Sequence, residues 1–167
     1  MSSSGVQLQQ HAIAPAVVVR GEGAWAEALP AIHALCSRPL LLGRSTATEA
    51  LRDQLSGDLR SQGLEPIGAT LRHDCCEADL QPLAEQARAA ACDAVLAAGG
   101  GKVLDAGKLL AHRLGLACIT VPTSAATCAG WTALANIYSP DGAFERDVAL
   151  DRCPDLLVFD HALVRQA

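Results

Sequence analysis

Three consecutive glycines followed by a lysine form the segment of this chain best suited to do chemistry. Gly99, Gly100 and Gly101 follow the apolar run 94–98 and precede Lys102. Glycine lets a backbone approach a phosphate closely, and a helix N-terminus offers free N–H groups and a positive dipole end. A tight turn without a ligand is the alternative, but three ordered glycines cost about 1 kcal/mol each relative to alanine. The segment therefore predicts a phosphate-binding turn, with the charge of Lys102 beside it.

The elements that must position this turn alternate along the chain. Short apolar runs alternate with stretches of helical spacing, which predicts βαβ units and a mainly parallel sheet. Strands are expected at 16–19, 39–43, 66–71, 94–98, 116–121 and 156–159. Helices are expected at 25–35, 47–62, 80–91 and 103–114, and a β-hairpin at 132–138 and 143–150. The fold class is therefore α/β, a Rossmann-like, mainly parallel sheet with flanking helices and a small β-hairpin.

Four local signals refine these boundaries. Thr46 and Glu49 have the spacing of a capping box, which predicts the start of a helix. Pro30 is expected near the first turn of its helix, where proline is best tolerated. The sequence Ser-Pro-Asp-Gly at 139–142 predicts the hairpin turn. Asp160 is expected to cap a short helix at the end of the last strand.

Length and charge limit the classes of function. The 167 residues fit one domain at 11–167, preceded by a polar, flexible tail at 1–10. A net charge of −5 and a pI near 5.4 argue against a nucleic-acid partner. The apolar runs are too short to span a membrane, and no signal peptide is recognisable at the N-terminus, so we expect a cytoplasmic protein.

Seven cysteines raise the question of disulfides or a metal site. The number is odd, and no CxxC pair is present, which favours reduced, buried structural thiols. The densest group of candidate ligands is the segment 73–77 (HDCCE). Adjacent ligands cannot easily converge on one tetrahedral ion, so we interpret this segment as a polar loop that opens a helix. No metal ligand is assigned.

The glycine turn and the residues after it resemble a known family. Segment 99–108 (GGGKVLDAGK) is similar to the GGGKxxDxxK motif of glycerol dehydrogenases, within the iron-containing alcohol dehydrogenase superfamily. Segments 121–127 (VPTSAAT) and 133–142 resemble the next block of that family, and 154–160 (PDLLVFD) resembles its PDxVxxD strand. Three motifs occur in the family's order, and the order of elements extends the match to nearly the whole chain.

The resemblance implies an NAD(P)-dependent alcohol or polyol dehydrogenase whose first domain binds the cofactor. The residues that it places at the pyrophosphate are Gly100, Gly101, Lys102 and Asp105. Those that it places along the adenine and nicotinamide parts are Thr123, Ala126, Thr132, Leu134 and Tyr138. Members that prefer NAD carry an acidic residue after the second strand, where this chain has Arg44. We therefore expect Arg44 to bind the 2′-phosphate of NADP, although a solvated surface arginine is the alternative.

Two further departures concern catalysis. The family's metal, zinc or iron, is held by a helical second domain that is absent from this chain, so the chain alone is expected to be inactive. Glycerol dehydrogenases carry an aspartate beside the nicotinamide where this chain has Cys128, our candidate catalytic residue. We also expect a homo-oligomer, because the face that the helical domain would cover is apolar. The alternatives are a non-catalytic nucleotide-binding module, or a relative of glycerol-1-phosphate dehydrogenase or 3-dehydroquinate synthase.

Overall fold

Six parallel strands form the central sheet of the computed structural model, which describes residues 14–167. The strands are β1 (Val17–Gly21), β2 (Pro39–Gly43), β3 (Ile67–Thr70), β4 (Ala94–Gly99), β5 (Ala117–Pro122) and β8 (Leu156–Asp160). Their order across the sheet is β1-β8-β5-β4-β2-β3. Every residue of β2 and β4 is buried, as the uninterrupted apolar runs predicted for strands covered on both faces. The predicted tail at 1–10 and the first residues of the predicted domain lie outside the described residues.

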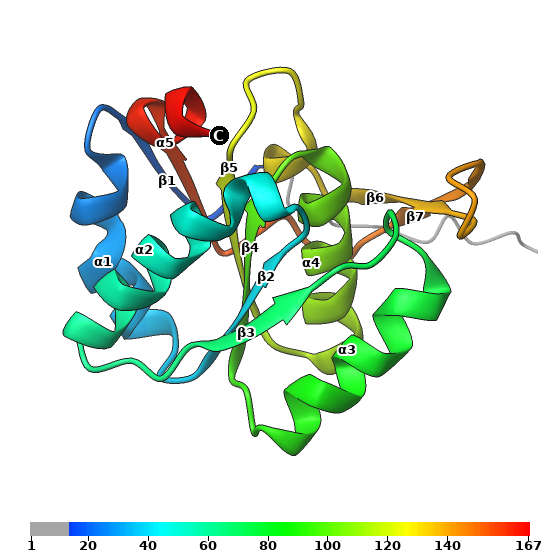
Figure 1. Cartoon of the computed structure of the whole chain (residues 1–167), viewed down its shortest axis with the longest axis horizontal. Coiled ribbons are helices and arrows are strands. Elements are labelled where there is room, and N and C mark those ends of the chain that lie inside the picture. The colour runs from blue at the N-terminus through cyan, green and yellow to red at the C-terminus, as the bar shows by residue number, and fades with distance from the viewer. Residues whose placement is uncertain (1–13) are drawn as a thin grey trace, which may run out of the picture.

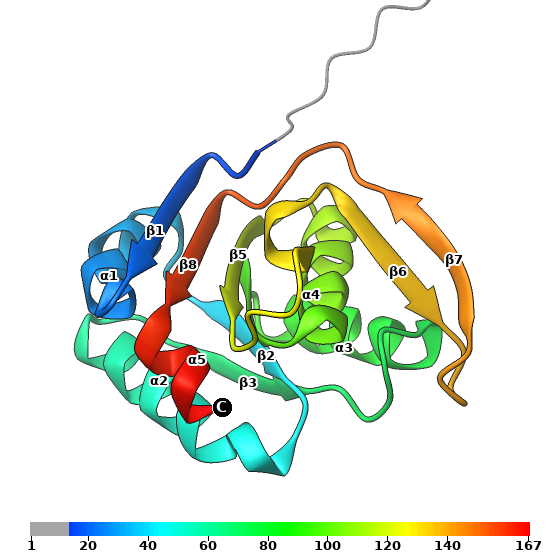
Figure 2. The same ribbon diagram turned by 90° about the horizontal axis from the view of Figure 1, so that it is seen from above.

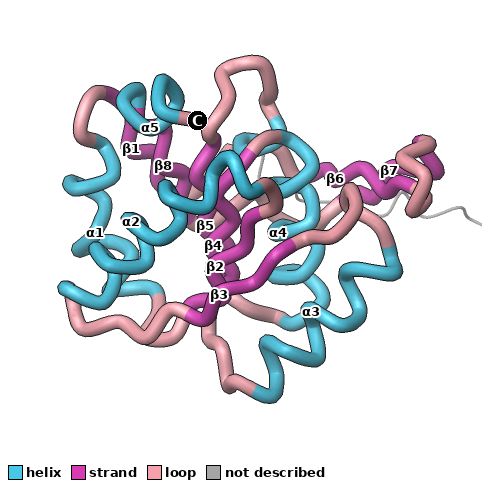
Figure 3. Tube along the Cα trace, viewed as in Figure 1, coloured by secondary structure: helices cyan, strands magenta, loops and turns pink. Residues whose placement is uncertain are grey.

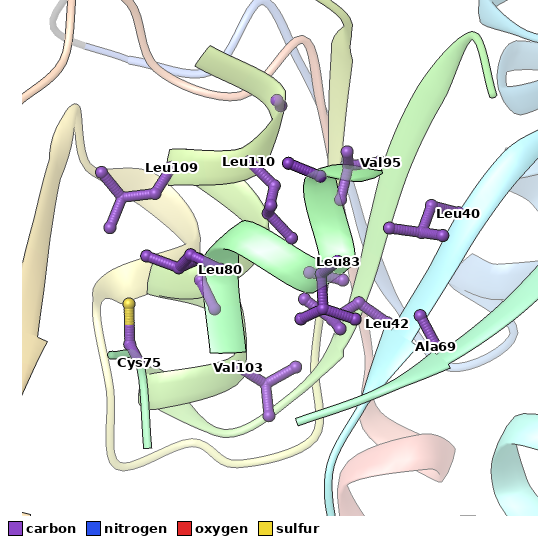
Figure 4. Close-up of a cluster of buried hydrophobic side chains, with 14 of the residues drawn as sticks. Leu40, Leu42, Ala69, Cys75, Leu80, Leu83, Val95, Val103, Leu109 and Leu110 are labelled. Carbon is purple, nitrogen blue, oxygen red and sulfur yellow. The ribbon is translucent and has the colours of Figure 1, made fainter. Parts of the chain in front are cut away.

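Helices cover both faces of this sheet. They are α1 (Ala24–Leu35), α2 (Glu49–Ser61), α3 (Glu77–Ala89), α4 (Gly101–Leu114) and the short α5 (His161–Gln166). Helices α1 and α2 lie on one face, and α3 and α4 lie on the other (Figure 1). The core is accordingly divided into two buried clusters. Figure 4 shows the one in which Leu83 of α3 and Leu110 of α4 pack with Val95 of β4.

The remaining two strands form the predicted hairpin beside the sheet. Strands β6 (Leu134–Tyr138) and β7 (Phe144–Ala149) are antiparallel and extend away from the body of the molecule (Figure 3). The turn between them has Gly142 at φ 85°, and the Gly142 N–H donates to the Ser139 carbonyl over 2.9 Å. Glycine adopts this left-handed conformation without the strain that a side chain would add. The fold class and the hairpin are thus confirmed.

The direction of the connections reverses between β2 and β4. From β2 the chain passes through α2 to the outer strand β3, and from β4 it passes through α4 to β5 on the opposite side. Because α2 and α4 lie on opposite faces, the segments leaving β2 and β4 diverge above the carboxyl ends of the strands (Figure 2). Open α/β sheets bind their ligands in the crevice at such a switch point.

Two of the local predictions are wrong. The turn that begins at Thr46 is a short 3₁₀ helix (Thr46–Thr48), and α2 starts at Glu49 without a side-chain cap, so no capping box forms. Helix α1 starts at Ala24, which places Pro30 in its interior. The proline leaves the Ala26 carbonyl without its helical donor, and this face of α1 is exposed, so water can take the donor's place.

The predicted cap at Asp160 is confirmed. Its carboxylate accepts the N–H of Ala162 over 2.8 Å at the start of α5. The other carboxylate oxygen accepts the N–H of Trp25 over 2.9 Å, in the first turn of α1. The buried Asp160 therefore serves two helix N-termini and joins the end of β8 to α1.

Candidate functional site

A cleft of about 580 Å³ opens at the switch point, a volume within the usual range for small-molecule sites. We call it the first cleft. Its walls come from the segments that follow β2, β4 and β5, at positions within 44–48, 98–103 and 123–125. Val164 of α5 and Ala167 close one side. Three carboxyl ends of parallel strands therefore contribute to one concave surface.

The glycine turn forms the floor of this cleft, and its glycines serve different purposes. A Cβ at Gly99 would lie 2.7 Å from the Cβ of Val103, so this glycine allows α4 to pack against its own strand. A Cβ at Gly100 would meet nothing within 4 Å and would project into open space. Gly100 is the N-cap residue of α4, and no side chain caps the helix there. The turn therefore presents uncapped backbone N–H groups beside an unobstructed backbone, which is what binding a phosphate requires.

Two cations lie at the edge of the first cleft and share one carboxylate. Arg44, just after β2, and Lys102, in the first turn of α4, each form an ion pair with a different oxygen of Asp74. The Asp74 side chain is 9% exposed, whereas those of Arg44 and Lys102 are 41% and 42% exposed. The Lys102 ammonium also lies 4.7 Å from the centroid of the Tyr138 ring. The three charges leave one net positive charge beside the glycine turn.

A second, smaller cleft of about 220 Å³ adjoins the first. It is lined by Gly101, Lys102, Asp105, Thr127, Cys128, Ala129, Thr132, Leu134, Asn136 and Tyr138. Gly101 and Lys102 also line the first cleft, so the two clefts meet at the N-terminus of α4. The structure thus brings nearly all of the predicted site residues to two adjacent clefts.

Asp105 lies in the second cleft with its carboxylate engaged in contacts within the protein. One oxygen lies 3.0 Å from the ammonium of Lys108, and the other accepts the N–H of Asn136 over 3.2 Å. Lys108 is 2% exposed and donates to the carbonyls of Thr132 and Leu134. The Asp105–Lys108 pair therefore attaches the base of the hairpin to α4. Contact between Asp105 and a cofactor stays a prediction.

The loop after β5 holds the remaining predicted residues. Thr123 lines the first cleft, and its N–H donates to the Gly99 carbonyl over 3.0 Å. Ala126 is exposed and lines neither cleft.

Cys128 is the one exposed cysteine, as the other six are buried. Burial, aided by the charge of Asp155, raises the pKa of Cys118 to about 12, so this thiol stays protonated at neutral pH. The prediction of buried structural thiols thus holds for all cysteines except Cys128.

The polar segment before α3 brings three metal-binding residue types together. Single ligand atoms of His73, Cys76 and Asp79 lie within 4.8 Å of one another. The Asp79 carboxylate, however, accepts the backbone N–H groups of Arg72 and His73 over 2.6 and 2.7 Å, and lies 2.9 Å from the His73 ring nitrogen. Burial raises the pKa of Asp79, but these hydrogen bonds outweigh burial and lower it overall. These hydrogen bonds with the loop that precedes α3 satisfy the Asp79 carboxylate, and we assign no metal to the group.

Comparison with known proteins identifies the family of this chain. A 32% identical glycerol dehydrogenase of Escherichia coli matches 80% of this chain and 36% of its own length. An uncharacterized oxidoreductase of Synechocystis is 48% identical over 93% of this chain and 40% of its own. A crystal structure of a probable glycerol dehydrogenase from Sinorhizobium meliloti superposes with a TM-score of 0.82 at 27% identity, covering 94% of this chain and 42% of that one. The chain thus spans about two fifths of the length of these relatives. The family model for iron-containing alcohol dehydrogenase matches residues 15–161, and the chain belongs to that family.

Proposed function

We propose that this chain is the cofactor-binding part of an NAD(P)-dependent, metal-containing alcohol or polyol dehydrogenase. The reaction would transfer a hydride between a secondary alcohol and nicotinamide. One observation carries the proposal. The uncapped N-terminus of α4, lined by glycine and flanked by Lys102, opens into a cleft at the switch point of the sheet. Membership of the iron-containing alcohol dehydrogenase family supports it.

We propose that the two clefts together hold one dinucleotide. Such a cofactor carries its pyrophosphate between two nucleosides, and the clefts meet at the glycine turn with one on each side. The N–H groups of Gly101 and Lys102 would bind the pyrophosphate. The adenosine would occupy the first cleft, beside Thr123 and Arg44. The nicotinamide would lie toward the second cleft, which contains Thr132 and Tyr138.

Arg44 favours acceptance of NADP(H) at least as readily as NAD(H). It lies directly after β2, where an acidic residue would bind the ribose hydroxyls of NAD and repel a 2′-phosphate. Its guanidinium is partly exposed at the first cleft, next to the hydroxyl of Ser45. A guanidinium retains several N–H donors after pairing with one carboxylate oxygen. We propose that these donors bind the 2′-phosphate.

The substrate would be a small alcohol or polyol. Bound nicotinamide supplies the hydride acceptor, and the exposed Cys128 lines the cleft proposed for it. Oxidation of an unactivated alcohol also needs a Lewis acid to stabilise the developing alkoxide. We assign no ligand for zinc or iron among residues 14–167, and propose that these ligands lie outside this chain. A catalytic role of Cys128, a homo-oligomeric state and a cytoplasmic location stay predictions.

Calorimetry with NAD⁺ and NADP⁺ on the 167-residue chain tests the proposal. We expect both to bind, and Lys102→Met to weaken both, while Arg88→Met on the far part of α3 leaves both unchanged. An assay with glycerol and added Zn²⁺ should show no turnover. Failure of both dinucleotides to bind would refute the proposed function, and metal-dependent turnover by this chain would refute the placement of the metal ligands.

A further inference from the structure

Asp74 was not among the residues predicted from the sequence, yet it contacts both cations of the first cleft. It lies in the segment between β3 and α3, and its two carboxylate oxygens pair with Arg44 and Lys102. Those residues follow β2 and β4, the two strands that flank the switch point. A single buried anion therefore sits behind both cations that the proposed cofactor would meet.

The hairpin holds Asp74 in place. The N–H of Tyr138 donates to the carbonyl of Cys75 over 2.8 Å, which fixes the backbone next to Asp74. A Cβ at Gly142 would lie 3.4 Å from the carboxylate, so the hairpin turn also packs against it. The Asp74 side chain is 9% exposed, and each of its oxygens is paired with a cation. Its charge is a fixed feature of the cleft.

A fixed carboxylate has different consequences for the two parts of a dinucleotide. The pyrophosphate is common to NAD and NADP, so any effect of Asp74 through Lys102 changes the affinity for both cofactors equally. Only NADP has a 2′-phosphate. In folds of this kind the residue after the second strand contacts the ribose 2′ position, and here that residue is Arg44, directly after β2. Asp74 and a 2′-phosphate would therefore compete for the same guanidinium.

We propose that Asp74 is a specificity-determining residue that acts through Arg44 and limits the preference of the cleft for a 2′-phosphorylated dinucleotide. This rests on the proposed function. Because Asp74 occupies one N–H group of Arg44 and offsets its charge, the 2′-phosphate gains less from the guanidinium than it would without Asp74. Asp74 is thus a positioning residue, and it need not touch the cofactor.

The test measures the ratio of the Kd values for NAD⁺ and NADP⁺ in Asp74→Asn, Arg44→Ala and the double variant. We expect Asp74→Asn to raise the selectivity for NADP⁺ by about threefold to tenfold, the range that release of a partly exposed ion pair allows. In the Arg44→Ala background the same substitution should leave the ratio unchanged. A merely structural role for Asp74 would weaken both cofactors together and leave the ratio where it was.

An unchanged ratio in Asp74→Asn, or an equal rise in the Arg44→Ala background, would overturn this inference while leaving the proposed function intact. Absence of dinucleotide binding by the unmodified chain would instead overturn the proposed function. If the asparagine variant does not fold, Asp74→Ser removes the same charge with a smaller side chain and gives the same comparison. Titration with 2′-AMP provides a second readout, in which Asp74→Asn should bind it more tightly and should lose this gain in the Arg44→Ala background.

Discussion

Alanine substitutions at two neighbouring glycines should have opposite effects on stability and binding. Gly99→Ala would place a methyl group 2.7 Å from the Cβ of Val103, inside the contact between β4 and α4. Gly100→Ala would add the same methyl group one residue later, where nothing lies within 4 Å. The two variants therefore have the same chemical change in the same turn and differ only in the direction of the added group.

The expected magnitudes follow from these surroundings. Overpacking a well-packed contact costs about 1–3 kcal/mol, so Gly99→Ala should lower the free energy of unfolding by that amount. For a chain of this size, each 1 kcal/mol lowers Tm by roughly 2–4 °C. Gly100→Ala should change Tm little, but its methyl group would occupy the approach of the pyrophosphate. Loss of one charge-assisted hydrogen bond, worth about 1.5–3 kcal/mol, would raise the Kd for a dinucleotide about tenfold to a hundredfold.

Thermal unfolding and calorimetry on both variants provide the assay. We expect a lower Tm for Gly99→Ala and weaker binding of NAD⁺ and NADP⁺ by Gly100→Ala at an unchanged Tm. If Gly100→Ala binds both cofactors as tightly as the unmodified chain does, the phosphate does not approach this glycine and the reasoning is refuted. Gly100→Ser serves as a further check, because a longer side chain at the same position should weaken binding more.

Three further predictions concern single side chains. Lys108→Ala should lower the free energy of unfolding by about 3–5 kcal/mol, because it leaves the buried carboxylate of Asp105 without its ion pair. If the ion pair is the cause, denaturant unfolding should show a smaller loss in the double variant Lys108→Ala/Asp105→Asn. Asp79→Asn should lower the free energy of unfolding by about 1–2 kcal/mol at neutral pH through loss of charge-assisted hydrogen bonds. The pKa of Asp79 is lowered in the folded chain, so the stabilisation by its carboxylate is present above the ordinary pKa of 3.8 and is lost as pH falls through the lower folded value. An equal loss of unfolding free energy in Asp79→Asn at pH 7 and at pH 2 would contradict this prediction. Cys128 should be the one thiol that reacts quickly with a thiol reagent before unfolding, and NADP⁺ should slow that reaction if the second cleft belongs to the cofactor site.

Much of the fold was predictable because its signals are local. The apolar runs of the buried strands stand out by composition, and glycines mark the helix ends, as Gly115 does at φ 66° after α4. The glycine turn was also predictable, since three glycines between a strand and a helix are typical of a backbone that a phosphate approaches closely. Errors arose where a neighbouring element decided the outcome. The position of Pro30 depends on where α1 starts, and that start is set by Asp160 on a distant strand.

The part of the site that the sequence did not predict is the arrangement of its charges. Asp74 is separated from Arg44 by 30 residues and from Lys102 by 28, and only the order of the strands brings the three together. The available signal was an acidic residue soon after a predicted strand, at the carboxyl edge that also holds the glycine turn. Sequence reasoning likewise assigned no role to Lys108, whose buried ammonium donates to the carbonyls of Thr132 and Leu134 at the base of the hairpin.

The most direct test of the account is the location of the bound dinucleotide. Amide chemical shifts of the 167-residue chain, recorded during titration with NADP⁺ and with NAD⁺, report which backbone N–H groups meet the ligand. We expect the largest changes at residues 99–103 with either cofactor, and additional changes at Arg44 and Ser45 that are greater with NADP⁺. Binding that leaves the amides of Gly101 and Lys102 unshifted would contradict the claim that this glycine turn holds the pyrophosphate.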